Sequence, residues 1–245
     1  MSQPPAEPAE GADPAHVAAV LAVAADAVPV AGATVVVAID GRSGSGKTVL
    51  GTAVAGALGC SIVHLDDIFP GWDGLAAGVA AVTEQVLEPL ARGERAAYQR
   101  WDWMRSRPGR TIDVPAGRHL VLEGCGALVP PALEHAAVRV WVDAPDAVRR
   151  RRALGRDGDL YAPHWQRWAA QEDAVYESVR PWQQAHLVLS TGLRWRSRTP
   201  GQHWPEASTG CPSVGCCCSR SASPCSPPGS WPARCSDTST RSSRR

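Results

Sequence analysis

The residues best suited to chemistry form an eight-residue segment that begins at Gly41 and reads Gly-Arg-Ser-Gly-Ser-Gly-Lys-Thr. It matches the phosphate-binding pattern G-x-x-x-x-G-K-[ST] at every fixed position. Glycines let the chain curl so that consecutive backbone N–H groups surround a polyphosphate. Lys47, the only lysine of the chain, can reach the β- and γ-phosphates, and the Thr48 hydroxyl can ligate Mg²⁺. The predicted cofactor site comprises Gly41, Arg42, Ser43, Gly44, Ser45, Gly46, Lys47 and Thr48.

Acidic residues stand where other short apolar segments end. Asp66 and Asp67 follow one such segment, and Glu123 follows another. In a parallel sheet these carboxyl ends meet at the ligand-binding edge. Asp66 and Asp67 are therefore candidates for a base that deprotonates a hydroxyl, and Glu123 is a candidate for binding Mg²⁺ together with Thr48. Helix capping by the aspartates and an ordinary strand end at Glu123 are the alternative interpretations.

A run of four arginines, 149–152, precedes Arg156. On a helix the four side chains point around the whole circumference, so at least two of them face solvent. Arg152 and Arg156 are spaced four residues apart and share a face. We expect these two arginines to fold over the phosphates and to take part in catalysis with Lys47.

The classes of nucleotide-binding protein can be narrowed further. A GTPase needs an Asn-Lys-x-Asp segment to read guanine, and that segment is absent because the single lysine, Lys47, belongs to the phosphate loop. Oligomeric ATPases need a longer module. The chain up to residue 191 is net acidic although the whole carries a net charge of +1, which argues against nucleic acid as a partner. A small kinase that uses ATP and Mg²⁺ remains the leading hypothesis.

The elements that must position these residues alternate between strand and helix. This alternation predicts an α/β fold, a three-layer α/β/α sandwich around a five-stranded, mostly parallel sheet. The Trp-rich segment 92–115 receives no assignment. The predicted strands are 34–39, 61–65, 119–122, 138–142 and 185–189, and the predicted helices are 15–27, 47–58, 75–90, 130–135, 145–154 and 163–179.

Composition divides the chain into three parts. Residues 1–14 are Pro/Ala-rich and are expected to be a disordered leader, 15–191 a kinase-like domain, and 192–245 a Ser/Cys/Arg-rich tail. We expect the tail to be disordered or the product of out-of-frame reading. The N-terminus lacks the basic region of a signal peptide, and no run approaches the roughly 20 apolar residues that span a bilayer. A cytoplasmic protein without a membrane partner is expected.

Taken together, these motifs resemble the uridine kinase-like branch of the P-loop nucleoside and small-molecule kinases, over about residues 33–190. The resemblance is carried by the phosphate loop, Asp67-Ile-Phe69, Val121–Gly124, Val142-Asp143 and Arg151–Asp157. It implies the strand order 2-3-1-4-5. It also implies that Asp67 is the base, that Glu123 serves the metal, and that Arg152 and Arg156 contact phosphates.

The segments expected to bind the phosphoryl acceptor depart from that family. Phe69–Gly74 does not match its nucleoside-binding stretch, and Tyr98–Trp103 matches only loosely. Trp101 and Trp103 either stack on a base, with Asp102 or Arg105 reading polar groups, or pack a lid or the core. The sequence thus predicts phosphoryl transfer to a hydroxyl of a nucleoside or another small molecule. An ATP-binding regulatory or accessory protein without transfer activity is the alternative, and the acceptor and oligomeric state are left open.

Overall fold

A computed structural model describes residues 11–192 of the chain. Most of the predicted leader, 1–14, and nearly all of the predicted tail, 192–245, lie outside the described residues. Within residues 11–192, no helix is both long enough and apolar enough to cross a membrane.

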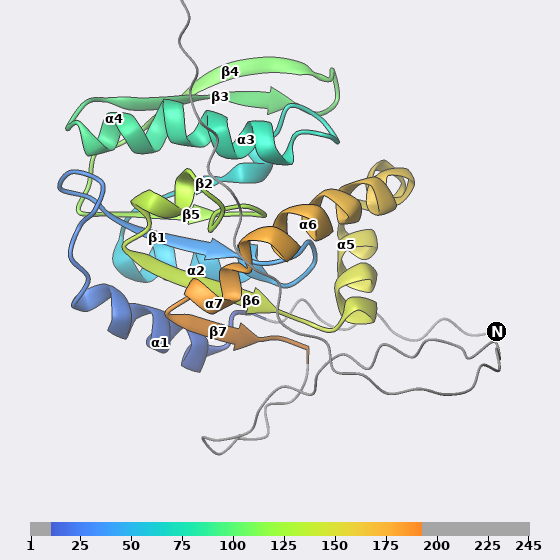
Figure 1. The fold of residues 1–245 in the computed structure, drawn as a ribbon, viewed down its shortest axis with the longest axis horizontal. Helices are drawn as coiled ribbons and strands as arrows, with labels where there is room; N and C mark the ends of the chain where they lie inside the picture. Colours follow the sequence, from blue (N-terminus) through green and yellow to red (C-terminus); the bar gives the residue numbers. More distant parts are fainter. Residues whose placement is uncertain (1–10, 193–245) are drawn as a thin grey trace, which may run out of the picture. The chain divides into compact units, whose positions relative to one another are not determined.

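The central feature is a sheet of five parallel strands in the order β2-β5-β1-β6-β7 (Figure 1). Counted among these five strands alone, the order is 2-3-1-4-5, so the predicted topology is confirmed. The backbone register sets Glu123 level with both Ile39 and His64. The carboxyl ends of three adjacent strands therefore meet at one edge. The strands are β1 (Val35–Asp40), β2 (Ser61–His64), β5 (His119–Glu123), β6 (Val138–Asp143) and β7 (Leu187–Ser190).

Helices cover both faces of the sheet, as the fully buried β1 shows. Val35, Val37 and Ile39 pack into one hydrophobic cluster with α1 (Pro14–Ala25) and α2 (Lys47–Leu58), whereas Val36 and Ala38 belong to a second cluster on the opposite face. This alternation is the period-two pattern of a strand buried on both sides. The second cluster receives α3 (Leu75–Val82), α4 (Glu88–Ala91), α5 (Asp146–Tyr161) and α6 (Trp165–Val179). A short α7 (Pro181–Gln184) and 3₁₀ turns at Leu65–Asp67, Ala132–His135 and Ala162–His164 complete the described part.

The segment that the sequence left unassigned forms an antiparallel hairpin of β3 (Ala96–Asp102) and β4 (Arg107–Val114). The hairpin lies beside α3 and α4 (Figure 1). Only the start of β3 is buried, at Ala96 and Tyr98, and a register shift between Gln99 and Trp101 interrupts the alternation. The hydrophobic periodicity on which strand prediction depends is therefore weak here.

Three predicted helices differ from those of the structure. The predicted helix 130–135 is only a 3₁₀ turn at Ala132–His135. The predicted helix 75–90 contains a π-helical turn at Thr83–Leu87. The predicted helix 145–154 continues to Tyr161, with non-helical backbone at Gly158. The helix passes Gly155 because a glycine in a helix costs only about 1 kcal/mol, and burial of Tyr161 in the core favours the extension.

Candidate functional site

The eight-residue phosphate loop connects β1 to α2, and Gly46 caps the N-terminus of that helix. Gly44 has φ +79°, and an added Cβ would lie 2.1 Å from the carbonyl oxygen of Arg149, so only glycine fits. Among residues 11–192, the backbone N–H groups of Gly44, Gly46, Lys47 and Thr48 have no acceptor. Unpaired N–H groups at a helix N-terminus bind anions. The loop thus fits the phosphates that the sequence predicts.

The two predicted metal ligands are in direct contact. The Thr48 hydroxyl donates to Oε1 of Glu123 at 3.0 Å, and Nδ1 of His64 lies 2.7 Å from Oε2. Burial opposes ionisation of Glu123, but its hydrogen bond with His64 and the charge of Lys47 lower its pKa overall. Among residues 11–192, no three His, Cys, Asp or Glu side chains form a metal cluster. Mg²⁺ usually takes one or two carboxylates with water and phosphate oxygens, and this hydroxyl–carboxylate pair matches that ligand type.

Lys47 is buried against the loop and the end of β5. Its Nζ donates to the carbonyl oxygen of Arg42 at 3.3 Å and to Sγ of Cys125 at 3.5 Å. Burial disfavours the ammonium, but the surrounding negative groups, including Glu123 and Asp66, raise its pKa. Lys47 is therefore charged at neutral pH.

The two aspartates after β2 have different surroundings. Asp66 is exposed, but the enclosing protein and the charge of Glu123 raise the pKa of its carboxyl, against the opposing effects of Lys47 and Arg156. Asp67 accepts a hydrogen bond from Nε of Arg100 at 2.9 Å. The Asp66 carboxyl thus interacts electrostatically with Glu123 and Lys47 of the predicted metal and phosphate sites. Asp67 is instead bonded to the hairpin.

The two predicted arginines, Arg152 and Arg156, have different partners near the phosphate loop. Arg152 donates to the Thr191 hydroxyl at 2.9 Å, which in turn donates to the carbonyl oxygen of Ser45 at 2.6 Å. Arg156 pairs with Asp157, which raises its pKa, and the charge of Asp66 contributes in the same sense. Both therefore lie around the phosphate loop, one through a threonine and the other near the candidate base.

Sequence reasoning did not single out Arg149, the first arginine of the run. Arg149 is 6% exposed and donates to the carbonyl oxygen of Ser43 at 3.2 Å and to Asp146 at 2.6 Å. Arg149 belongs to α5 and thus anchors the loop to that helix. Helical periodicity alone cannot tell which of four consecutive arginines faces inward.

Sequence reasoning also missed Glu172. Its Oε1 accepts from the Ser43 N–H at 2.7 Å, the Trp168 indole N–H at 3.0 Å and the Cys125 thiol at 3.2 Å, and its Oε2 lies 4.0 Å from Arg149. The sequence feature that could have revealed Glu172 is a carboxylate on the apolar face of a helix. The buried residues of α6 recur at helical spacing and are Trp165, Trp168, Glu172 and Tyr176. A buried charge at such a position needs partners.

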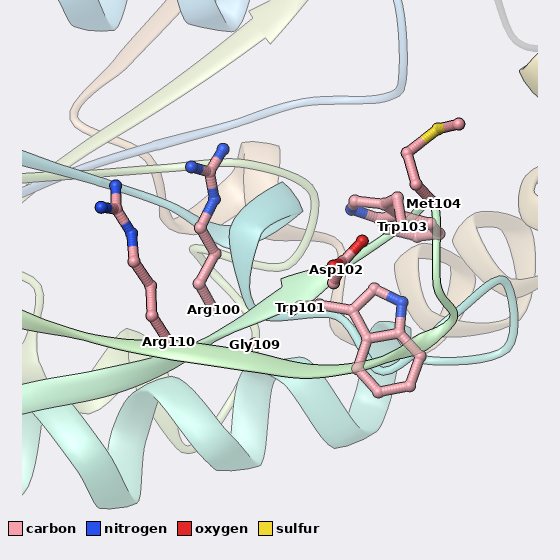
Figure 2. Close-up of a pocket in the computed structure, with 7 residues that line it drawn as sticks. All are labelled: Arg100, Trp101, Asp102, Trp103, Met104, Gly109 and Arg110. Atoms are coloured by element: carbon pink, nitrogen blue, oxygen red, sulfur yellow. The ribbon is translucent and has the colours of Figure 1, made fainter.

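A cavity of about 330 Å³ opens at the hairpin (Figure 2). Trp103 lines it but packs on Trp72, with ring centroids 4.7 Å apart, and its indole N–H donates to the carbonyl oxygen of Asp66 at 2.8 Å. This agrees with the packing role considered for Trp103. The predicted polar readers, Asp102 and Arg105, are bonded to each other at 2.8 Å. The cavity is lined by Arg100, Trp101, Asp102, Trp103, Met104, Gly109 and Arg110.

Comparison with solved structures identifies the class of fold. A possible uridine kinase from Bacillus stearothermophilus superposes with a TM-score of 0.54 at 18% identity, covering 71% of this chain and 97% of that one. A protein described as a kinase of a fructose transport system from Silicibacter sp. TM1040 covers 71% of this chain and 98% of its own, with a TM-score of 0.44 and 19% identity. No family model and no curated protein sequence matches the chain. The fold is that of the P-loop kinases, as the resemblance of the motifs implied.

Proposed function

We propose that this protein transfers the γ-phosphoryl group of ATP to a hydroxyl of a nucleoside or another small molecule, with Mg²⁺. One observation carries the proposal. The phosphate loop, the Thr48–Glu123 pair and two aspartates meet at one edge of the sheet. We assign the activity to residues 15–191 and to the cytoplasm, and assign the tail no function.

Each residue has a role that its contacts support. The free N–H groups of the loop and the Lys47 ammonium hold the triphosphate, and Thr48 and Glu123 hold the metal. When bound, Mg²⁺ neutralises charge on the phosphoryl oxygens. Arg152 and Arg156 stabilise the charge that develops on the transferred group.

The surroundings of the two aspartates favour Asp66 as the base, although the resemblance assigns that role to Asp67. A general base works best with a pKa raised toward the operating pH, and the enclosing protein and the charge of Glu123 raise the pKa of Asp66. The Asp67 carboxylate is already engaged by Arg100 of the hairpin. We therefore propose that Asp66 accepts the proton and that Asp67 positions the hairpin.

The test compares Asp66→Asn and Asp67→Asn, with Asp26→Asn as control, because Asp26 is exposed and lies just after α1. ADP release is measured with a panel of nucleosides, sugars and hydroxy acids, and binding of an ATP analogue is measured separately. Loss of general-base catalysis is expected to slow D66N by about 10²- to 10⁴-fold while nucleotide binding survives. D67N is expected to lose less, mainly through a higher KM for the acceptor.

Other outcomes would redirect the assignment. Full activity in D66N with loss in D67N would return the base to Asp67. Tight binding of the analogue with no stimulated turnover of any compound would favour a regulatory ATP-binding protein.

A further inference from the structure

We propose that the phosphoryl acceptor carries an anionic group, a carboxylate or a phosphate, which binds between Arg100 and Arg110 of the hairpin. This inference rests on the proposed kinase function and names the substrate class of the same site. A neutral nucleoside would leave these groups unused.

The position of the cavity supports an acceptor site. Its volume of about 330 Å³ is that of a small-molecule pocket. Two of its lining residues are bonded to the acid pair, because Arg100 donates to Asp67 and Trp103 donates to the backbone of Asp66. The cavity therefore adjoins the segment that carries both aspartates.

The guanidinium groups are arranged for an anion. Arg100 and Arg110 project from neighbouring strands toward the same side of the hairpin, whereas the Trp101 ring lies on the other side (Figure 2). Arg100 uses only Nε for Asp67, so its two terminal amino groups have no partner among residues 11–192. The Arg110 side chain likewise has no hydrogen bond or ion pair within the described part of the chain. Such forks match the geometry of carboxylate and phosphate oxygens.

The charges around the cavity leave a surplus of positive charge. Asp102 is paired with Arg105 at 2.8 Å, and Asp67 is paired with Arg100. Arg110 is thus the uncompensated charge of the lining. Arg110 also affects the neighbouring Tyr98. Burial and the charge of Asp67 raise the pKa of the Tyr98 hydroxyl, and the charges of Arg100 and Arg110 oppose that shift. An anion bound between the guanidinium groups of Arg100 and Arg110 would neutralise this remaining positive charge.

The test is a binding titration that does not depend on turnover. Trp101 and Trp103 line the cavity, so tryptophan fluorescence reports binding while an excess of a non-hydrolysable ATP analogue occupies the phosphate loop. Gluconate is compared with glucose, and ribose 5-phosphate with ribose; uridine serves as a neutral nucleoside. The two pairs distinguish a carboxylate from a phosphate. The variants are Arg110→Gln and the matched control Arg107→Gln, an exposed arginine on the same strand that does not line the cavity.

At least one anionic compound is expected to bind about fivefold or more tightly than its neutral partner, and R110Q is expected to lose that preference. R107Q is expected to keep it. Equal binding of each pair, equal losses in R107Q and R110Q, or binding of uridine alone would overturn the proposal. Anion binding without ADP release would uphold the site and refute the kinase. ADP release with uridine that R110Q leaves unchanged would uphold the kinase and refute the anionic acceptor.

Discussion

Replacing Glu172 with alanine is expected to loosen the phosphate loop and to destabilise the protein. The carboxylate is 1% exposed and joins α6 to the loop through the Ser43 N–H. Without it, the Ser43 and Trp168 N–H groups lose their acceptor in a place that water cannot easily reach. Arg149 also loses its nearby buried counter-charge.

The structure sets the size of the effect. Hydrogen bonds to a charged group contribute about 1.5–3 kcal/mol each, and breaking a buried charge network by removing one partner costs about 3–5 kcal/mol. The contacts of Glu172 overlap, so we expect a total near the second figure. For a chain of this size that corresponds to a fall in Tm of about 10 °C.

Urea unfolding followed by far-UV circular dichroism measures this loss as a change in midpoint. Asp173→Ala is the matched control, because Asp173 is the next residue but its side chain is 58% exposed and bonds only Arg42 among residues 11–192. Its loss is expected to stay below about 1 kcal/mol. Glu172→Gln keeps one acceptor oxygen and is expected to fall between the two. Affinity for an ATP analogue is expected to weaken in parallel with the loss of stability.

The reasoning fails if E172A is as stable as D173A, because Glu172 would then not hold the loop. It also fails if E172A loses stability but binds the ATP analogue as tightly as the wild type. In that case the contact stabilises α6 without shaping the nucleotide site.

The remaining predictions concern stability. Burial raises the pKa of Asp40 to about 6 from 3.8; folding therefore favours its protonated form, and the stabilisation present below pH 4 is lost as pH rises through 6. The unfolding free energy of the wild type relative to Asp40→Asn should fall by about 3 kcal/mol between pH 4 and 7.5, and a flat difference would contradict the shift. Gly56→Ala in α2, where an added Cβ meets nothing within 4 Å, should raise the unfolding free energy by about 0.5–1 kcal/mol. Gly51→Ala, one and a half turns earlier, should instead lower it by about 1 kcal/mol, because the new Cβ would lie 3.1 Å from Cγ of Glu123; equal effects in urea unfolding would refute the packing argument.

The fold was predictable where hydrophobic periodicity is strong. The fully buried β1 and the proline-free α2 have sequences that permit few other structures, and the motifs fixed their order around the sheet. The hairpin was not predictable, because β3 is only partly buried and its alternation is broken by the register shift. In the folded protein β3 packs against the segment 83–87, and no periodicity within β3 indicates this contact.

Local sequence spacing was sufficient to identify the candidate site residues that belong to the phosphate loop. Thr48 and Glu123 are 75 positions apart, yet the convergence of parallel strand ends predicted them at the same edge of the sheet, and their side-chain oxygens are 3.0 Å apart. The distinction between Asp66 and Asp67 was beyond the sequence. Adjacent residues point in different directions, and only the fold decides that one faces Glu123 and the other Arg100.

The sequence by itself determined that the chain contains a loop suited to binding phosphate. The glycines, the lysine and the threonine of the motif all lie within one short segment, so their spacing alone identifies it. The tertiary structure decided what surrounds that loop. Glu172 and Arg149 lie 129 and 106 positions from Ser43, and no spacing rule connects them. Charges that meet across such separations are brought together by packing of the core, so their partners and pKa values follow from the fold and not from any short segment. The same holds for Arg100 and Arg110, whose side chains face one side of the site only because the hairpin pairs their strands.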